Sequence, residues 1–97
     1  MFGPVGITPD GKVAPGVEAQ TEAALNNILG VLKAAGMGLE DVVKLTTFLV
    51  NANDIAKVRA ARIRVLGSHR PASTLVIISR LAAPEYLIEI EATAAKV

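Results

Sequence analysis

The amino-acid sequence predicts a single small α/β domain, in which a mixed sheet carries two helices on one of its faces. Two stretches have apolar residues at helical spacing, and three others are rich in β-branched and aliphatic residues, as strands are. The expected helices span 17–35 and 55–66, and the expected strands span 42–50, 73–79 and 86–94. A chain of 97 residues has room for one hydrophobic core, so we expect 1–97 to form one domain.

The first expected helix has acidic residues at its start, Glu18 and Glu22, and Lys33 in its last turn, which suits the helix dipole. The expected strand 42–50 has apolar residues on both of its faces, as a strand buried on both sides would. Before the first helix, only Val5 to Ile7 resembles a strand, and it is short.

The connection 80–85 between the last two strands contains Pro84 and is short enough for a hairpin. Right-handed crossovers should place both helices on the same face of the sheet. The opposite face still carries Leu, Val and Ile, so we expect a second copy of the chain to cover it. The alternative is a monomer with a modestly exposed sheet.

Composition narrows the classes of function. The chain is 52% hydrophobic, has a net charge of +1 and contains no cysteine, so neither nucleic acid binding nor thiolate chemistry is expected. No apolar run is long enough to cross a membrane, and no signal pattern is visible, so we expect a cytoplasmic protein. No metal-ligand cluster, phosphate loop or dinucleotide motif is present, and we expect no metal and no cofactor.

Charged residues interrupt the apolar pattern on the last strand and on the second helix. Glu89 and Glu91 alternate with residues expected to face the helices, so both should lie on the opposite face of the sheet. Arg59 and Arg62 fall within the apolar arc of the second helix, where guanidinium groups usually meet carboxylates or a ligand. For the two glutamates the alternative to lining a cleft is an ion-paired or rim-exposed strand face. For the two arginines the alternative is intersubunit salt bridges, or side chains whose apolar stems are buried while their charged ends reach solvent. His69 is expected to be an exposed loop residue.

Several segments, in this order, resemble the YjgF/Rid family over nearly the whole chain. They include Arg70-Pro71-Ala72 and Ile88-Glu89-Ile90-Glu91-Ala92, and the others are 18–21, 24–27, 31–36 and 39–46. The resemblance implies a chorismate-mutase-like fold and a homotrimer with clefts between subunits. For its best-known branch it implies cofactor-independent hydrolysis of enamines and imines (RidA-type imine deaminase), and it also carries an L-PSP endoribonuclease label.

The resemblance also implies a set of site residues. Glu89 matches the glutamate of the family's cleft, which positions water and would be catalytic. Ser73 stands where the active branch has an arginine that clamps the substrate carboxylate, and serine cannot form that clamp. Arg59 replaces a common asparagine, Leu75 a common cysteine, and Gly3 is what remains of a Ser-Gly-Gln motif; these would bind substrate. Members of the family usually begin earlier, with a first strand that would be missing here.

We therefore expect a homo-oligomer that binds a small carbonyl or imine metabolite between subunits and has weak imine deaminase activity at most. Arg59 is the candidate for supplying the missing cation. A non-catalytic ligand-binding or interaction module is the alternative, which Ser73 favours. An endoribonuclease is the third hypothesis, and the scarcity of aromatic residues argues against it.

Overall fold

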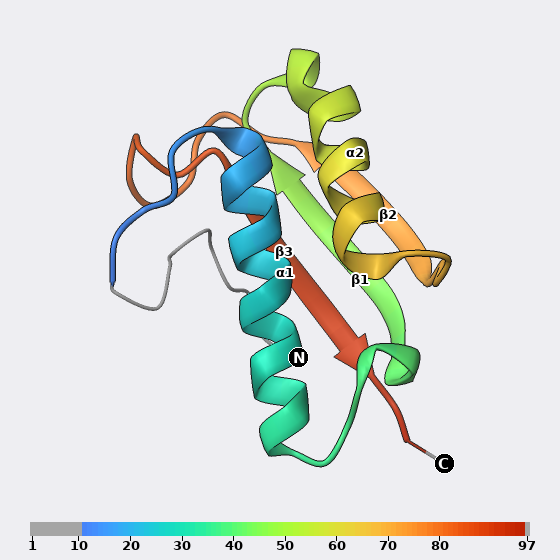
Figure 1. Ribbon diagram of the computed structural model, residues 1–97. Coiled ribbons are helices and arrows are strands. Elements are labelled where there is room, and N and C mark those ends of the chain that lie inside the picture. The colour runs from blue at the N-terminus through green and yellow to red at the C-terminus, as the bar shows by residue number, and fades with distance from the viewer. Residues whose placement is uncertain (1–10, 97) are drawn as a thin grey trace.

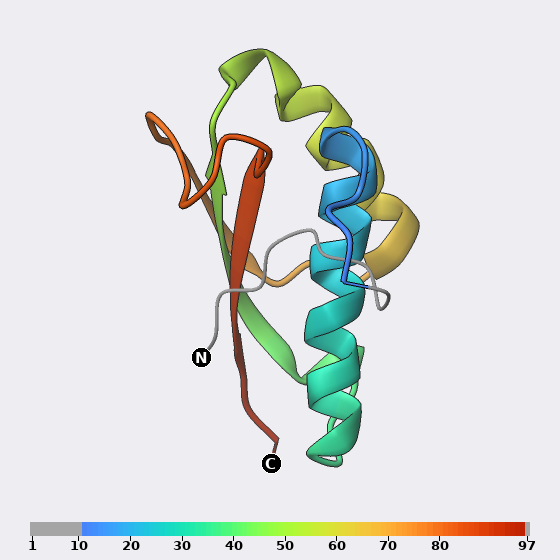
Figure 2. The ribbon, with the colours of Figure 1, turned by 90° about the vertical axis from the view of Figure 1, so that its left-hand side faces the viewer.

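The computed structural model describes residues 11–96, which form a three-stranded sheet with two helices packed on one face (Figure 1). Seen from the side, both helices lie on the same side of the sheet, as the sequence predicts (Figure 2). The elements are α1 (Val17–Ala34), β1 (Val42–Leu49), α2 (Ile55–Leu66), β2 (Ala72–Ile77) and β3 (Ile88–Ala94), with short 3-10 turns at Leu39–Asp41 and Ala52–Asp54. The expected strand at Val5 to Ile7 and the expected site residue Gly3 lie outside the described residues.

The strand order is β2-β1-β3, with β1 parallel to β2 and antiparallel to β3. The expected hairpin between the last two strands is therefore wrong, because both strands pair with β1 from opposite sides. The crossover through α2 places β2 on one edge of β1 and leaves the other edge for β3. Both strands are also shorter than expected, because the chain between Ile77 and Ile88 must pass from one edge of the sheet to the other.

The face of the sheet that meets the helices forms the core. Leu45, Leu49, Ile88 and Ile90 are at most 1% exposed, and they pack in one cluster with apolar residues of both helices. The helical members of that cluster are Val17, Ala24, Leu25, Ile28, Leu32, Val58 and Leu66. As expected, alternate residues of β3 point into this core, which leaves Glu89 on the other face of the sheet.

The other face of β1 is only partly covered in this chain, and its expected burial by a second copy of the chain stays a prediction. Phe48 is half-buried, and Val43 is 47% exposed. A shift in the pairing between Val42 and Lys44 changes the alternation at the start of the strand. Such a bulge turns Val42 into the core and Val43 out of it, the reverse of what strict alternation gives for Val43.

A buried glutamine fixes the loop that leads into β3. The side chain of Gln20 on α1 donates to the carbonyl oxygens of Ala14 (3.1 Å) and Glu85 (2.9 Å), and it accepts from the amide of Leu87 (2.8 Å). The amide is thereby satisfied, as a buried polar group must be. Among residues 11–96, no helix is both long and apolar enough to cross a bilayer.

We predict that Ile28→Ala lowers the free energy of unfolding by about 2–5 kcal/mol, because Ile28 is 1% exposed and its loss leaves a cavity. The matched control is Val31→Ala on the same helix, where the side chain is 53% exposed; its effect should stay within about 0.5 kcal/mol. Chemical denaturation at one fixed protein concentration measures both variants. Equal losses for the two would contradict this description of the core.

Candidate functional site

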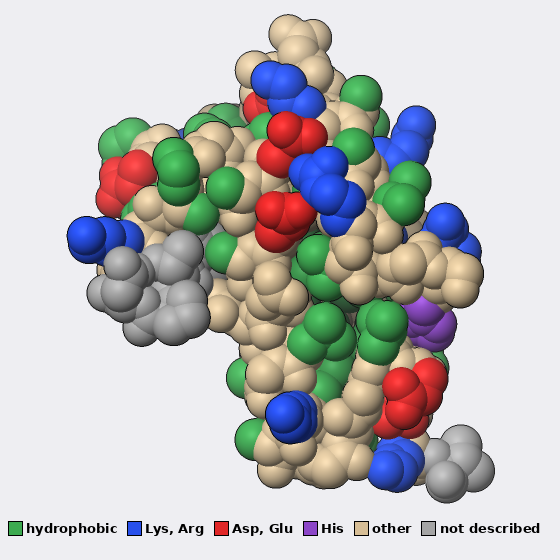
Figure 3. Space-filling view, viewed as in Figure 1, with side chains coloured by type: hydrophobic (Ala, Val, Ile, Leu, Met, Phe, Trp, Pro, Cys, Tyr) green, Lys and Arg blue, Asp and Glu red, His purple; other side chains and the backbone are tan. Residues whose placement is uncertain are grey.

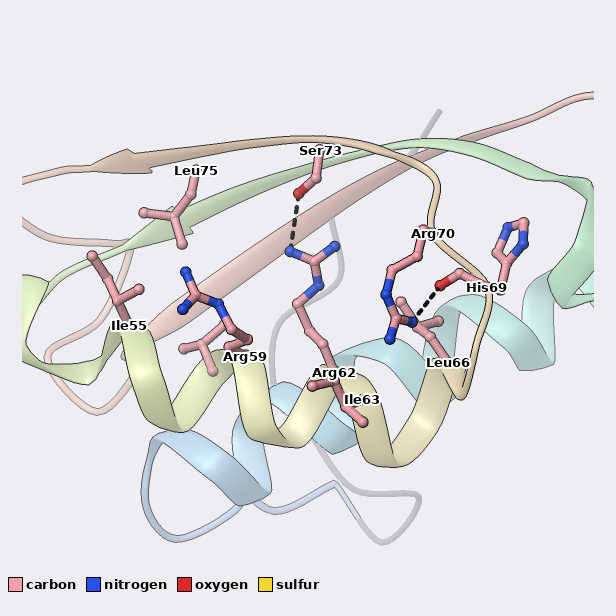
Figure 4. A pocket seen from close by; sticks show the side chains of 10 residues that line it. Ile55, Arg59, Arg62, Ile63, Leu66, His69, Arg70, Ser73 and Leu75 are labelled. Atoms are coloured by element: carbon pink, nitrogen blue, oxygen red, sulfur yellow. Dashed lines mark hydrogen bonds between the residues drawn. The ribbon is translucent and has the colours of Figure 1, made fainter.

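A pocket of about 520 Å³ lies between α2 and β2 (Figure 4). This volume is in the range of small-molecule sites. Its walls are apolar side chains of both elements together with three arginines and a serine. The lining residues are Ile55, Val58, Arg59, Arg62, Ile63, Leu66, His69, Arg70, Ser73 and Leu75.

Helical spacing puts two of the arginines side by side. Val58, Ala61 and Leu66 are the buried residues of α2 and attach it to the core. Arg59 and Arg62 are three residues apart, so they project from one side of the helix, and both extend toward β2 (Figure 4). Their position facing protein was expected from the sequence, although Arg62 is half-buried whereas Arg59 is exposed.

Arg62 contacts Ser73, where the resemblance implies an arginine in active members of the family. Its Nη1 donates to the hydroxyl oxygen of Ser73 at 2.9 Å. Partial burial lowers the pKa of Arg62, and the positive charges of Arg70 and Arg59 lower it further. A guanidinium therefore lies directly at Ser73, supplied by α2 instead of by β2. Arg59 extends toward Ile55 and Leu75, at some distance from Ser73 (Figure 4).

Arg70 is the third cation and precedes the start of β2. Its Nη1 donates to the carbonyl oxygens of Gly67 and His69, which hold the guanidinium at the loop end of the pocket. No carboxylate of residues 11–96 forms an ion pair with Arg59, Arg62 or Arg70, and no Asp or Glu lines the pocket. The pocket therefore has an unneutralised positive charge.

His69 is not the exposed loop residue that the sequence suggested. It is half-buried, and its Nε2 lies 2.8 Å from the carbonyl oxygen of Val42, a distance that fits donation by a protonated Nε2. Its ring is turned away from the arginines (Figure 4). This contact ties the loop before β2 to the start of β1, so His69 has a structural role here.

The side of α2 that faces α1 carries an arginine that is ion-paired. Arg64 was expected to face solvent and is exposed, but it also bridges to α1, with Nε 2.7 Å from Glu22 and Nη2 3.4 Å from Glu18. Acidic and basic side chains alternate over this junction of the two helices (Figure 3). The cation on the α1 side of α2 is thus paired, whereas those on the β2 side are not.

Glu89 lies on the opposite face of the sheet from the pocket. In the register of the sheet, Glu89 pairs with Phe48, whereas Ser73 pairs with Leu45 on the helix-facing side. Partial burial raises the pKa of Glu89 above its ordinary value, and the nearby carboxylate of Glu91 raises it further. A single chain therefore does not bring Glu89 and Ser73 together.

The structure thus gathers three of the expected site residues, Ser73, Leu75 and Arg59, in one pocket, and it separates Glu89 from them. Arg70 was missed as a site residue. Its position just before β2, next to the end of α2, was the available signal. Within the described part of the chain, no three His, Cys, Asp or Glu side chains gather in a way that could hold a metal ion.

Comparison with known proteins identifies relatives along the full chain. Residues 1–96 match the family described as Endoribonuclease L-PSP. A RutC family protein of Pyrococcus horikoshii is 41% identical over 98 residues, which is 99% of this chain and 77% of that protein. The 2-iminobutanoate/2-iminopropanoate deaminase of Salmonella typhimurium is 37% identical over 89 residues, covering 89% of this chain and 69% of the deaminase.

The fold is shared with solved structures of the same group. The crystal structure of the YjgF gene product of Escherichia coli superposes with a TM-score of 0.90 at 33% identity, covering 99% of this chain and 78% of that one. The sequence match and the shared arrangement of two helices on a mixed sheet agree. The chain therefore belongs to the Endoribonuclease L-PSP family, which is the YjgF/Rid family.

Proposed function

We propose that this protein binds a small anionic carbonyl or imine metabolite in the pocket between α2 and β2, and that it hydrolyses imines slowly at most. The observation that carries the proposal is the set of three arginines around a pocket without a carboxylate, with Arg62 bonded to Ser73. A carboxylate in this pocket would receive charge-assisted hydrogen bonds, which are the strong ones. The deaminase relative from Salmonella typhimurium supports the choice of imine chemistry.

The reaction would be a hydrolysis without a cofactor. Water adds to the carbon of the C=N bond, a proton moves to nitrogen, ammonia leaves, and a C=O bond remains. The protein must hold the substrate carboxylate and assist the proton transfers. We assign Arg62 to hold the substrate carboxylate, because its guanidinium already lies within hydrogen-bond distance of the hydroxyl of Ser73.

Glu89 is the residue that we assign to the proton transfers, and this assignment requires a second copy of the chain. The pocket and Glu89 are on opposite faces of one sheet, so a complete site needs the Glu89 face of one subunit against the pocket of another. We therefore propose a homotrimer with clefts between subunits, in which Arg59 or Arg62 of one subunit is near Glu89 of its neighbour. We also infer a cytoplasmic location, as the sequence suggests.

The second candidate is a binding protein without catalysis. The observation that favours it is the hydroxyl of Ser73, which accepts from Arg62 and offers a carboxylate one uncharged donor at most, so it cannot form a bidentate clamp. A ligand would then bind to Arg62 without the two-point clamp that orients it for attack by water.

We predict slow release of ammonia from freshly generated 2-iminopropanoate, and a further loss of about ten- to a hundredfold in Arg62→Gln, because a hydrogen bond to a charged group contributes about 1.5–3 kcal/mol. Arg64→Gln is the matched control and should keep the rate, since Arg64 is paired on the other side of α2. The exchange variant with Ser73→Arg and Arg62→Ser should raise the rate. If Arg59→Ala abolishes activity and Arg62→Gln does not, Arg59 supplies the cation instead.

We predict that in the dissociated single chain the pKa of Glu89, followed by carbon NMR of its carboxyl group, lies above the ordinary glutamate value and falls in Glu91→Gln, because that change removes a neighbouring negative charge. In the proposed trimer an arginine of the neighbouring subunit would lower this pKa. The dissociated folded chain holds this proton more tightly than the unfolded chain does. The resulting contribution to stability is complete below the ordinary pKa and is lost as the pH rises through the raised one. An unchanged pKa in Glu91→Gln would contradict the coupling.

We predict a trimer in solution at micromolar concentration, because the half-buried face with Phe48 and Glu89 needs a cover. Sedimentation equilibrium measures the assembly. A stable monomer would contradict both the trimer and the shared site. A dimer would still agree with a second copy covering the sheet, but it would contradict the trimer.

A further inference from the structure

The charge around the pocket exceeds what one carboxylate would neutralise. The hydrogen bonds of Arg62 and Arg70 end on neutral oxygens, namely the hydroxyl of Ser73 and the backbone carbonyls of Gly67 and His69. The guanidinium of Arg59 has no hydrogen-bond or ion-pair partner among residues 11–96. Three positive charges thus share one pocket, and no Asp or Glu of residues 11–96 in the same chain lines it. The proposed Glu89 of a neighbouring subunit would offset one of these charges and leave two.

This arrangement is unfavourable in the empty protein. Like charges three residues apart on a helix repel each other, and Arg59 and Arg62 have that spacing. On its other side, toward α1, the same helix has a neutralised cation, because Arg64 has two glutamates as partners. A ligand with more than one negative charge would relieve the repulsion on the β2 side, as Glu18 and Glu22 do on the α1 side.

The polar groups of the pocket are also placed so that a ligand with an acidic group at each end of a short carbon chain could contact two of them. Along α2, the pocket has two polar places (Figure 4). At one of them, Arg62 donates to the hydroxyl of Ser73. At the other, Arg59 lies next to the apolar side chains of Ile55 and Leu75 (Figure 4). Arg70 is held on backbone carbonyls, so it adds positive charge at the loop end and has fewer free donors of its own.

We infer that the ligand is a small dianion: a 2-oxo or 2-imino acid on a short carbon chain with a second acidic group. One acidic group would bind Arg62 at Ser73, and the other would bind Arg59. The inference rests on the proposed function and narrows its class of substrate. Either a second carboxylate or a phosphate could be the second acidic group, and the phosphate carries the larger negative charge.

The test is titration calorimetry of the full chain in its own assembly, at one fixed ionic strength. The probes are 2-oxopentanoate and 2-oxoglutarate, which have the same number of carbons and differ by one terminal carboxylate. We expect 2-oxoglutarate to bind about tenfold more tightly or better, which corresponds to at least about 1.4 kcal/mol. The phosphate probe is 2-oxo-4-phosphonobutanoate, in which a phosphonate replaces the terminal carboxylate of 2-oxoglutarate, and tighter binding of this probe than of 2-oxoglutarate would identify a phosphate-type group as the second group.

Variants of Arg59 and Arg62 distinguish how much each arginine contributes to the binding affinity. Arg59→Gln should reduce the affinity for 2-oxoglutarate to that for 2-oxopentanoate, Arg59→Lys should keep part of the difference, and the control Arg64→Gln should keep all of it. Arg62→Gln should weaken both probes. If neither dianion binds more tightly than 2-oxopentanoate, or if Arg59→Gln retains the preference, the inference is overturned and the proposed function remains. If none of the probes binds, the proposed function fails as well.

Discussion

The main constraint on this structure is that two helices can cover only one face of its sheet. Right-handed crossovers place α1 and α2 on the same side, where they bury Leu45, Leu49, Ile88 and Ile90. On the opposite face, Glu89 and Phe48 are only half-buried in the single chain. The division of the sheet into a closed and an open face also separates the two halves of the expected site.

The same constraint produces the pocket. Because β2 is an edge strand that pairs only with β1, α2 lies over the edge of the sheet, and the side of this helix that faces β2 is only partly filled by apolar residues. Arg59 and Arg62 occupy that side. The guanidinium of Arg62 then reaches the hydroxyl of Ser73 across the gap between helix and strand.

Charge is distributed on α2 according to what lies beside each side of the helix. Toward α1, Arg64 meets Glu18 and Glu22, which are on an exposed helix surface where such pairs form with little cost of desolvation. Toward β2, the neighbours are Ser73 and Leu75, which carry no charge. The difference between a paired and an unpaired arginine on one helix is therefore a consequence of packing.

The sequence by itself determined the helices almost to the residue, because Gly36 and Gly67 follow them and their apolar residues repeat at helical spacing. It also determined which residues of β3 face the core, since alternation is a local property. Only the tertiary structure decided that β2 and β3 lie on opposite edges of β1, because strand pairing depends on contacts distant in sequence. For the same reason, the contact of Arg62 with Ser73, the place of Arg70 and the separation of Glu89 from the pocket could not be predicted from local patterns.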